Sequence, residues 1–246
     1  MFRFYAPSDN FSDNEVFLEK DDINHIKNVL RMDIGEKIIV CDGKGQDSLC
    51  EISYLDNSCV KATIINQYPC KAELPAQIIL FQGLPKKDKM ELIIQKAVEL
   101  GVSKIVPVST KNCVAKIEDR KKEAKKLERW RSIVLSAAKQ SGRGIIPKVC
   151  SVMSFKEAME YAKELEGAII PYEKAKGIEE SKKIIKDMAT KHSVGIFIGP
   201  EGGFDVAEIE TAQANNIHPI TLGNRILRTE TAGLTVLSIL MFEMEK

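Results

Sequence analysis

From residue 77 onward, short apolar runs alternate with amphipathic helical patterns, and this alternation limits what the chain can fold into. The runs at 78–81 and 194–198 are continuous and strand-like. The pattern over 88–100 places its apolar residues on one helical face, and Gly101 follows it as a C-terminal stop. Strands that alternate with helices predict an α/β domain with a mostly parallel sheet.

The other expected elements of this region follow the same rules. Asp88, Ser154 and Asp205 each precede a Glu by three positions, so each predicts a capping box at the start of a helix. Further strands are expected at 104–108, 168–170 and 217–222, and further helices at 118–140, 154–166, 179–189 and 231–243. The last of these helices is apolar almost all round, which is typical of a core helix or of a subunit interface.

Residues 1–71 follow a different pattern. Short β-branched runs at 37–41, 48–54 and 59–65 are separated by turn residues. One helix is expected at 22–32, ended by Gly35. We therefore predict a small β-barrel with one helix over residues 1–71, a linker at 72–76 and the α/β domain over 77–246.

Charge is distributed unevenly along the chain. The 36 Lys and Arg residues nearly cancel the 35 Asp and Glu residues, but residues 1–71 carry a net charge of −4 and residues 111–148 one of +8. The basic segment coincides with the helix at 118–140. It indicates either a solvated helix face or a surface for an anionic polymer. The side chains expected to face outward are Lys121, Lys122, Lys125, Arg129 and Arg143.

Neither a membrane segment nor a metal centre is expected. The chain has no run of 18 apolar residues, and its first residues lack the basic and apolar regions of a signal peptide. Its six cysteines form no C-x-x-C pair and lie at no metal-ligand spacing from His. We expect reduced thiols in a cytoplasmic protein without membrane or metal partners.

Glycine-rich segments follow three of the expected strands. They run from Gln82 to Lys86, from Ile198 to Asp205 and from Leu222 to Ala232. In parallel α/β domains ligands bind at the carboxyl ends of strands, where glycine lets the backbone approach the ligand closely. The chain has no Walker sequence and no G-x-G-x-x-G, so the usual ATP and NAD patterns are missing.

The sequence at these junctions resembles a known family. Ile198-Gly199-Pro200-Glu201-Gly202-Gly203-Phe204, followed by 222–232 (LGNRILRTETA), is similar to the signature of the 16S ribosomal RNA (uracil-N3)-methyltransferases of the SPOUT superfamily. The resemblance extends over the whole chain, including Arg3-Phe4-Tyr5 and Gln140-Ser141-Gly142-Arg143. Lys139 departs from it, because many members carry Glu there.

The resemblance implies a fold and an activity. The C-terminal domain would be a SPOUT-type α/β domain with a trefoil knot, and the N-terminal domain a PUA-like β-barrel that binds RNA. The cofactor would be S-adenosylmethionine, the active form a homodimer, and the target one uridine in the decoding region of 16S ribosomal RNA in the assembled small subunit. The cofactor would be bound by Tyr172, Glu173, Ile198, Gly199, Pro200, Glu201, Gly202, Leu222, Gly223, Ile226, Leu227, Arg228, Thr231 and Ala232. The candidates for RNA contact, from charge and resemblance, are Arg3, Arg31, Lys86, Lys87, Lys89 and Arg143.

The chemistry of the implied reaction points to catalytic candidates. Uracil N3 becomes a good nucleophile only when its imide proton is lost, so a cation should stabilise the anion and a carboxylate should take the proton. We expect Arg228 as the cation. Glu230 or Glu201 is expected as the proton acceptor or as the residue that orients Arg228, and the alternative for these residues is a buried ion pair that fixes the knot. A ribose 2′-O-methyltransferase and a non-catalytic ribosome-assembly factor that binds RNA remain alternatives.

Overall fold

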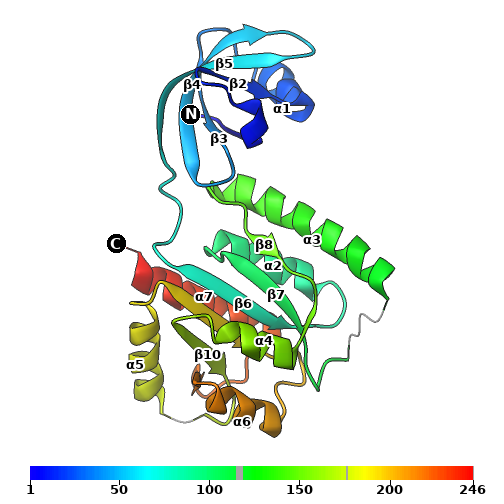
Figure 1. Ribbon diagram of the computed structural model, residues 1–246, viewed down its shortest axis with the longest axis vertical. Helices are drawn as coiled ribbons and strands as arrows, with labels where there is room; N and C mark the ends of the chain where they lie inside the picture. The colour runs from blue at the N-terminus through cyan, green and yellow to red at the C-terminus, as the bar shows by residue number, and fades with distance from the viewer. Residues whose placement is uncertain (115–118, 176, 246) are drawn as a thin grey trace. The chain divides into compact units, whose positions relative to one another are not determined.

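The computed structural model describes residues 1–114, 119–175 and 177–245, and its chain divides into two compact units (Figure 1). The first unit comprises Met1–Glu73 together with Ala138–Ile146, and the second comprises Leu74–Ala137 and the chain from Pro147 onward. The segment at 138–146 therefore clusters with the N-terminal residues, although it follows the basic helix in the sequence. The predicted domain boundaries at 71 and 77 stay a prediction.

The first unit is built on a five-stranded sheet in the order β1-β3-β4-β5-β2. Only the β1–β3 pair is parallel. The expected strands are present as β3, β4 and β5, whereas the sequence patterns do not predict β1 and β2. The strands are β1 (Arg3–Tyr5), β2 (Glu15–Leu18), β3 (Lys37–Cys41), β4 (Gln46–Leu55) and β5 (Val60–Pro69). Their inward side chains form one core with Ile26, which is fully buried.

The helix predicted at 22–32 begins and ends earlier than expected. It consists of α1 (Lys20–Asn24) followed by one wide turn, η2 (His25–Val29). A separate short turn, η1 (Ser8–Asn10), precedes β2. Arg31 adopts a left-handed backbone conformation with φ 54°, which a regular helix does not allow. The helix therefore ends before Gly35.

The second unit contains a seven-stranded sheet in which every pair is parallel. The order is β12-β10-β11-β6-β7-β8, with β9 also paired to β7. The strands are β6 (Gln77–Gly83), β7 (Lys104–Ser109), β8 (Lys148–Val149), β9 (Met153–Ser154), β10 (Gly167–Pro171), β11 (Ser193–Ile198) and β12 (Ile217–Ile220). The prediction of an α/β domain with a parallel sheet is confirmed.

Helices cover both faces of this sheet (Figure 1). They are α2 (Lys89–Glu99), α3 (Arg120–Ser141), α4 (Phe155–Ala162), α5 (Ile178–Met188), α6 (Val206–Ala214) and α7 (Thr229–Met244). One core joins α4 and α6 to the sheet and contains Phe81 stacked on Phe197 with ring centroids 4.2 Å apart. Coverage on both faces accounts for the continuous apolar runs of β6 and β11.

Two of the three predicted capping boxes are confirmed, at Ser154 and Asp205. The prediction at Asp88 is wrong, because its side chain makes no cap hydrogen bond. The carboxylate of Glu91 instead accepts a 2.8 Å hydrogen bond from Arg129. A charge-assisted bond to a guanidinium is stronger than a bond to a neutral backbone N–H. Glu91 therefore pairs with Arg129 rather than with the backbone N–H of Asp88. Glu118, expected at the start of the basic helix, lies outside the described residues.

Further expectations concern exposure. Leu127, Val134 and Ala138 are buried on one side of α3, as predicted. The expectation that Arg143 faces outward is wrong: it is 2% exposed. Helix α7 is only partly covered, with Phe242 78% exposed. No described helix has the length and hydropathy needed to cross a membrane. All six cysteines are free.

Candidate active site

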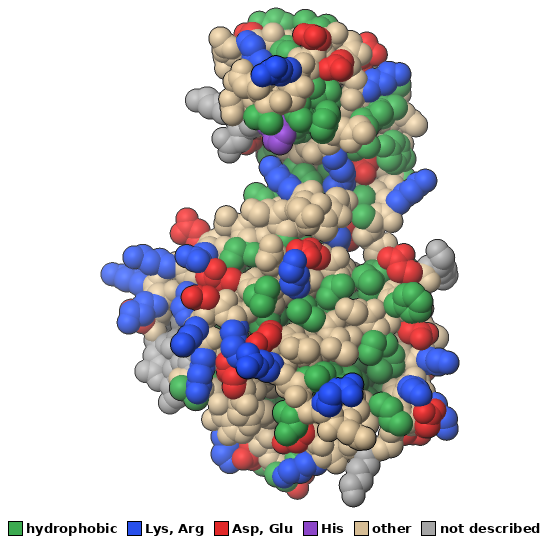
Figure 2. Space-filling model, turned by 180° about the vertical axis from the view of Figure 1, so that it is seen from behind, with side chains coloured by type: hydrophobic (Ala, Val, Ile, Leu, Met, Phe, Trp, Pro, Cys, Tyr) green, Lys and Arg blue, Asp and Glu red, His purple; other side chains and the backbone are tan. Residues whose placement is uncertain are grey.

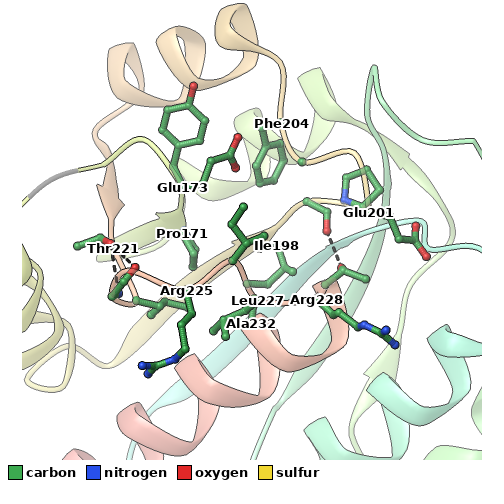
Figure 3. Close-up of a pocket in the computed structure, with 18 of the residues that line it drawn as sticks. Pro171, Glu173, Ile198, Glu201, Phe204, Thr221, Arg225, Leu227, Arg228 and Ala232 are labelled. Carbon is green, nitrogen blue, oxygen red and sulfur yellow. Dashed lines mark hydrogen bonds between the residues drawn. The ribbon is translucent and has the colours of Figure 1, made fainter.

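The carboxyl ends of β10, β11 and β12 meet at one edge of the parallel sheet and surround a cavity of about 340 Å³ (Figure 3). Its walls are the loops that follow these three strands, together with the first turns of α7 and one side chain of α2. The cavity therefore lies where an α/β sheet of this kind binds its ligands.

Close backbone contacts fix the shape of these loops. Gly83 ends β6, and a Cβ atom on it would lie 2.7 Å from the backbone nitrogen of Pro200. Thr229 at the start of α7 donates a 2.6 Å hydrogen bond to the carbonyl of Gly199 and accepts one of 2.9 Å from the amide of Gln82. These two bonds join the start of α7 to the ends of β6 and β11. Gln82 is fully buried, so its bond to Thr229 is shielded from water.

Most residues predicted for the cofactor lie around this cavity. Twelve of the fourteen line it: Tyr172, Glu173, Ile198, Gly199, Pro200, Glu201, Leu222, Gly223, Ile226, Leu227, Arg228 and Ala232. Gly202 and Thr231 do not line it. Cofactor binding by all fourteen stays a prediction.

Seven lining residues are absent from the predicted cofactor set: Lys89, Pro171, Gly203, Phe204, Thr221, Arg225 and Thr229. Six of them lie within two positions of predicted residues in the sequence, inside the same motifs or at their ends. Lys89 is instead one of the residues predicted to contact RNA. It reaches the cavity from α2, and no local sequence pattern predicts that position.

Lys89 joins the two candidate carboxylates. Its ammonium lies 3.1 Å from Glu201 and 3.2 Å from Glu230. The Glu201 carboxylate also accepts a 3.1 Å hydrogen bond from the backbone N–H of Lys86. Burial raises the pKa of Glu201, but bonds from backbone N–H groups and the charge of Lys89 outweigh burial, so its pKa lies below the ordinary value. Glu201 is therefore ionised at neutral pH.

Arg228 stands apart from this ion-pair cluster. Its backbone is extended, with φ −66° and ψ 154°, and its exposed side chain makes no cap hydrogen bond to α7. Across the described residues, its guanidinium has neither an ion-pair nor a hydrogen-bond partner. The two carboxylates contact Lys89 rather than Arg228, so the structure offers no contact through which they would orient it. The guanidinium is available to an anionic ligand.

Comparison with known proteins agrees with this architecture. The model of an RNA methyltransferase domain matches residues 72–241, and that of an RNA methyltransferase PUA domain matches residues 18–65. Ribosomal RNA small subunit methyltransferase E of Bacillus subtilis (strain 168) is 36% identical over 228 residues, which cover 92% of this chain and 89% of the relative. The chain belongs to the ribosomal RNA small subunit methyltransferase E family.

Two solved structures show the same fold. The Neisseria gonorrhoeae ribosomal RNA small subunit methyltransferase E, bound to S-adenosyl methionine, has a TM-score of 0.79 and 34% identity, and the match covers 97% of this chain and 95% of that one. A Legionella pneumophila protein in complex with the cofactor SAM has a TM-score of 0.80 and 31% identity, with 97% and 96% covered.

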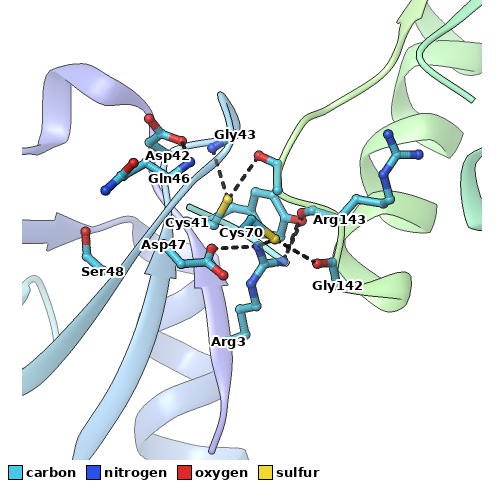
Figure 4. A network of polar contacts seen from close by, with 12 residues as sticks. Arg3, Cys41, Asp42, Gly43, Gln46, Asp47, Ser48, Cys70, Gly142 and Arg143 are labelled. Atoms are coloured by element: carbon cyan, nitrogen blue, oxygen red, sulfur yellow. Dashed lines mark hydrogen bonds and ion pairs between the residues drawn. The ribbon is translucent and has the colours of Figure 1, made fainter. Parts of the chain in front are cut away.

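The residues predicted to contact RNA are divided between the two units of this methyltransferase E family member. Arg31, Lys86 and Lys87 are exposed. Arg3 and Arg143 instead belong to a polar network inside the first unit (Figure 4). Arg143 bonds the carboxylate of Glu73 through two nitrogens, at 2.9 and 2.6 Å.

Arg3 lies at the centre of that network. Its guanidinium donates to Asp47 at 2.7 Å, to the backbone carbonyl of Arg143 at 2.9 Å and to the hydroxyl of Tyr5 at 2.8 Å. Burial raises the pKa of the neighbouring Cys41 thiol to about 12, which keeps it protonated and unreactive at neutral pH. Both guanidiniums are engaged within the unit, and RNA contact by Arg3 and Arg143 stays a prediction.

The described residues contain no group of three or more His, Cys, Asp and Glu side chains placed to hold a metal ion.

Proposed function

We propose that this chain is an S-adenosylmethionine-dependent methyltransferase that methylates N3 of one uridine in the decoding region of 16S ribosomal RNA, in the assembled small subunit. The observation that carries the proposal is the cavity at the ends of β10, β11 and β12, which is lined by the motif residues of a family with a cofactor-bound relative. The base and the position on the RNA rest on the family resemblance.

The residues of the cavity suit the proposed cofactor. About 340 Å³ lies within the usual range for small-molecule sites, roughly 300–1,000 Å³. Ile198, Leu227 and Phe204 supply apolar wall, and the glycine-rich loops supply backbone N–H and C=O groups for a purine edge. When bound, S-adenosylmethionine supplies a methyl group that its sulfonium already activates.

The side chains at the mouth of the cavity can prepare the uracil. The exposed guanidinium of Arg228 can hold O2 or O4 and stabilise the N3 anion. Of the two carboxylates, Glu201 is the one that lines the cavity, so we assign the proton acceptor to Glu201. Glu230 then serves to hold Lys89. The uracil must be unpaired or turned outward to expose N3.

The Arg228→Ala variant tests the catalytic assignment. We expect the methyl-transfer rate to fall by roughly 10²–10³-fold, because a preorganised donor to the developing anion is removed. Cofactor affinity, measured by calorimetry, should stay within a few fold of wild type. Arg228→Lys should retain part of the activity, since it keeps the charge but loses the planar fork.

The assay is methylation of purified, unmethylated small ribosomal subunits, followed by nucleoside mass spectrometry. A methyl group on N3 of uridine supports the proposal. A methyl group on a ribose 2′ oxygen would establish the alternative transferase, and RNA binding without any mass shift would establish the non-catalytic assembly factor. Equal loss of cofactor binding and activity in Arg228→Ala would overturn the role of Arg228.

We also propose a homodimer, a trefoil knot in the C-terminal domain and a cytoplasmic location. A second copy would cover apolar side chains at and near α7, where Phe242 is 78% and Ile226 90% exposed. Sedimentation of the purified chain tests the dimer, and cell fractionation tests the location. An experimental structure of the C-terminal domain tests the knot.

A further inference from the structure

Helix α3 carries an exposed basic surface that the proposed reaction does not use. The helix contains eight basic and two acidic residues. Four of its lysines occupy adjacent positions on the outer side and are exposed: Lys121, Lys122, Lys125 and Lys126. With the exposed Lys86 and Lys87 of the loop before α2, we name these six residues the lysine surface. Figure 2 shows Lys and Arg side chains gathered at this edge of the second unit.

Little of this charge is compensated by the protein itself. Within the described part of the chain, the six lysine side chains have no ion-pair partner. Of the two acids on α3, Glu123 is used structurally, since its carboxylate accepts a 2.9 Å hydrogen bond from the backbone N–H of Val152. By contrast, Arg129 is paired with Glu91 at 2.8 Å and is left out of the lysine surface.

The lysine surface leads toward the cavity. Lys87 and Lys126 line one small cleft of about 60 Å³ between α3 and the start of α2, so the helix and the loop adjoin each other there. The backbone N–H of Lys86, next along the loop, bonds Glu201 at 3.1 Å, and Glu201 lines the active-site cavity. The basic residues therefore extend from α3 to the mouth of the site within a single unit.

We propose that the lysine surface binds the phosphate backbone of the RNA strand that flanks the target nucleotide. Lysine ammonium groups act as point charges toward phosphate and need no fixed geometry, which suits a strand held by its backbone rather than read by its bases. Arg228, at the mouth of the cavity, continues the same sign of charge to the reacting base. The proposal rests on the proposed function and adds the path of the substrate strand.

The test compares two doubly substituted proteins with the same reduction in charge. Lys122→Gln with Lys126→Gln removes two charges from the lysine surface. Lys183→Gln with Lys186→Gln removes two exposed charges from α5, elsewhere on the same unit. Each protein is titrated with unmethylated small ribosomal subunits at several KCl concentrations, and kcat, KM and cofactor affinity are measured.

For the α3 variant we expect KM to rise about tenfold or more, with kcat and cofactor affinity near wild type. The slope of log affinity against log salt should become shallower by about 0.7 for each phosphate that the variant no longer neutralises. The α5 variant should behave as wild type. Equal weakening by both variants would show a general effect of net charge, and no change in KM or slope for the α3 variant would also overturn the proposal.

The two proposals can fail separately. If wild-type protein does not methylate the subunits, the proposed function fails, while the difference in salt slope between the variants still tests the lysine surface. If wild type methylates N3 and the α3 variant has normal KM and slope, only the lysine surface fails.

Discussion

A single ammonium connects the two candidate carboxylates of the active site. Lys89 comes from α2, Glu201 from the loop after β11, and Glu230 from the first turn of α7. The hydrogen bond to Glu201 raises the pKa of Lys89, with burial opposing it. Lys89 thus remains charged and holds two otherwise repelling carboxylates near the cavity. We regard it as a positioning residue for the acid–base chemistry.

Replacing Lys89 should shift the pH dependence of the reaction. Lys89→Met keeps much of the side-chain length but removes the charge that lowers the pKa of Glu201, so that pKa should rise. We expect the acidic limb of the kcat/KM profile to move to higher pH in Lys89→Met and to stay in place in Lys89→Arg. An unchanged limb in the methionine variant would contradict the positioning role.

The pH dependence of the free energy of unfolding should also depend on the interaction between Lys89 and Glu201. Because the folded-state pKa of Glu201 is depressed, its interactions stabilise the protein above the ordinary carboxyl pKa of 4.5 and disappear as the pH falls through the lowered value. The wild type should therefore lose more stability on acidification than Lys89→Met does, as urea denaturation at a series of pH values would measure.

At the scale of elements, two glycines lie where secondary-structure elements pack closely beside the active site. The end of β6 touches the β11 loop at Gly83, and α7 passes β11 at Gly233. At Gly83 an added Cβ would lie 2.7 Å from Pro200, whereas at Gly233 it would lie 3.6 Å from Ile198. The first position leaves no room for a methyl group and the second does.

Alanine at these two glycines should have opposite effects. Gly83→Ala forces the β11 loop to move and should lower the free energy of unfolding by about 1–3 kcal/mol, with weaker cofactor binding. Gly233→Ala lies in a helix at ordinary contact distance and should raise the free energy of unfolding by up to about 1 kcal/mol. Urea denaturation and calorimetry measure both quantities. Similar stability changes in both variants would refute the packing argument.

The secondary-structure elements that could be predicted are those that their own local sequence determines. Strands β6 and β11 are continuous apolar runs because α/β packing buries both faces, and Ser154 caps α4 through residues in the same turn. Strands β1 and β2 have three and four residues and depend on pairing with β3 and β5, so their own sequences carry little information.

The site was predictable to the same extent. Motif residues after β11 and β12 mark the cavity because strand ends of a parallel sheet converge. The bridge from Lys89 to Glu201 and Glu230 joins three separate elements, and the burial of Arg143 follows from its pairing with Glu73. Both depend on tertiary contacts that local spacing does not encode.

On the scale of the whole molecule, the chain has one fluorescent side chain that reports on only one of its two units. The sequence has one tryptophan, Trp130, which is buried in α3 and belongs to the second unit. Its emission therefore follows the unfolding of the unit that contains the cavity. This makes cofactor binding measurable as a gain in stability.

Addition of S-adenosylmethionine at about one hundred times its Kd should raise the free energy of unfolding, followed by Trp130 emission in urea, by about 2.7 kcal/mol. The same concentration of methionine, which lacks the adenosine part, should have little effect. If saturating cofactor left the Trp130 transition unchanged, the cofactor would not bind the folded second unit, and the cavity assignment would fail.

The pairing of β6 with β11 also determines when the cavity can form during folding. This pair joins Gln77 to Ser193, so α2, α3, α4 and α5 all lie inside the loop that it closes. Contacts between residues so distant in the chain carry a large loop-closure entropy and slow folding. A growing polypeptide that has emerged only as far as β10 has no partner for β6 on that side and no cavity wall from β11, β12 or α7. Such an intermediate exposes the unpaired edge of β6, the kind of surface that chaperones protect.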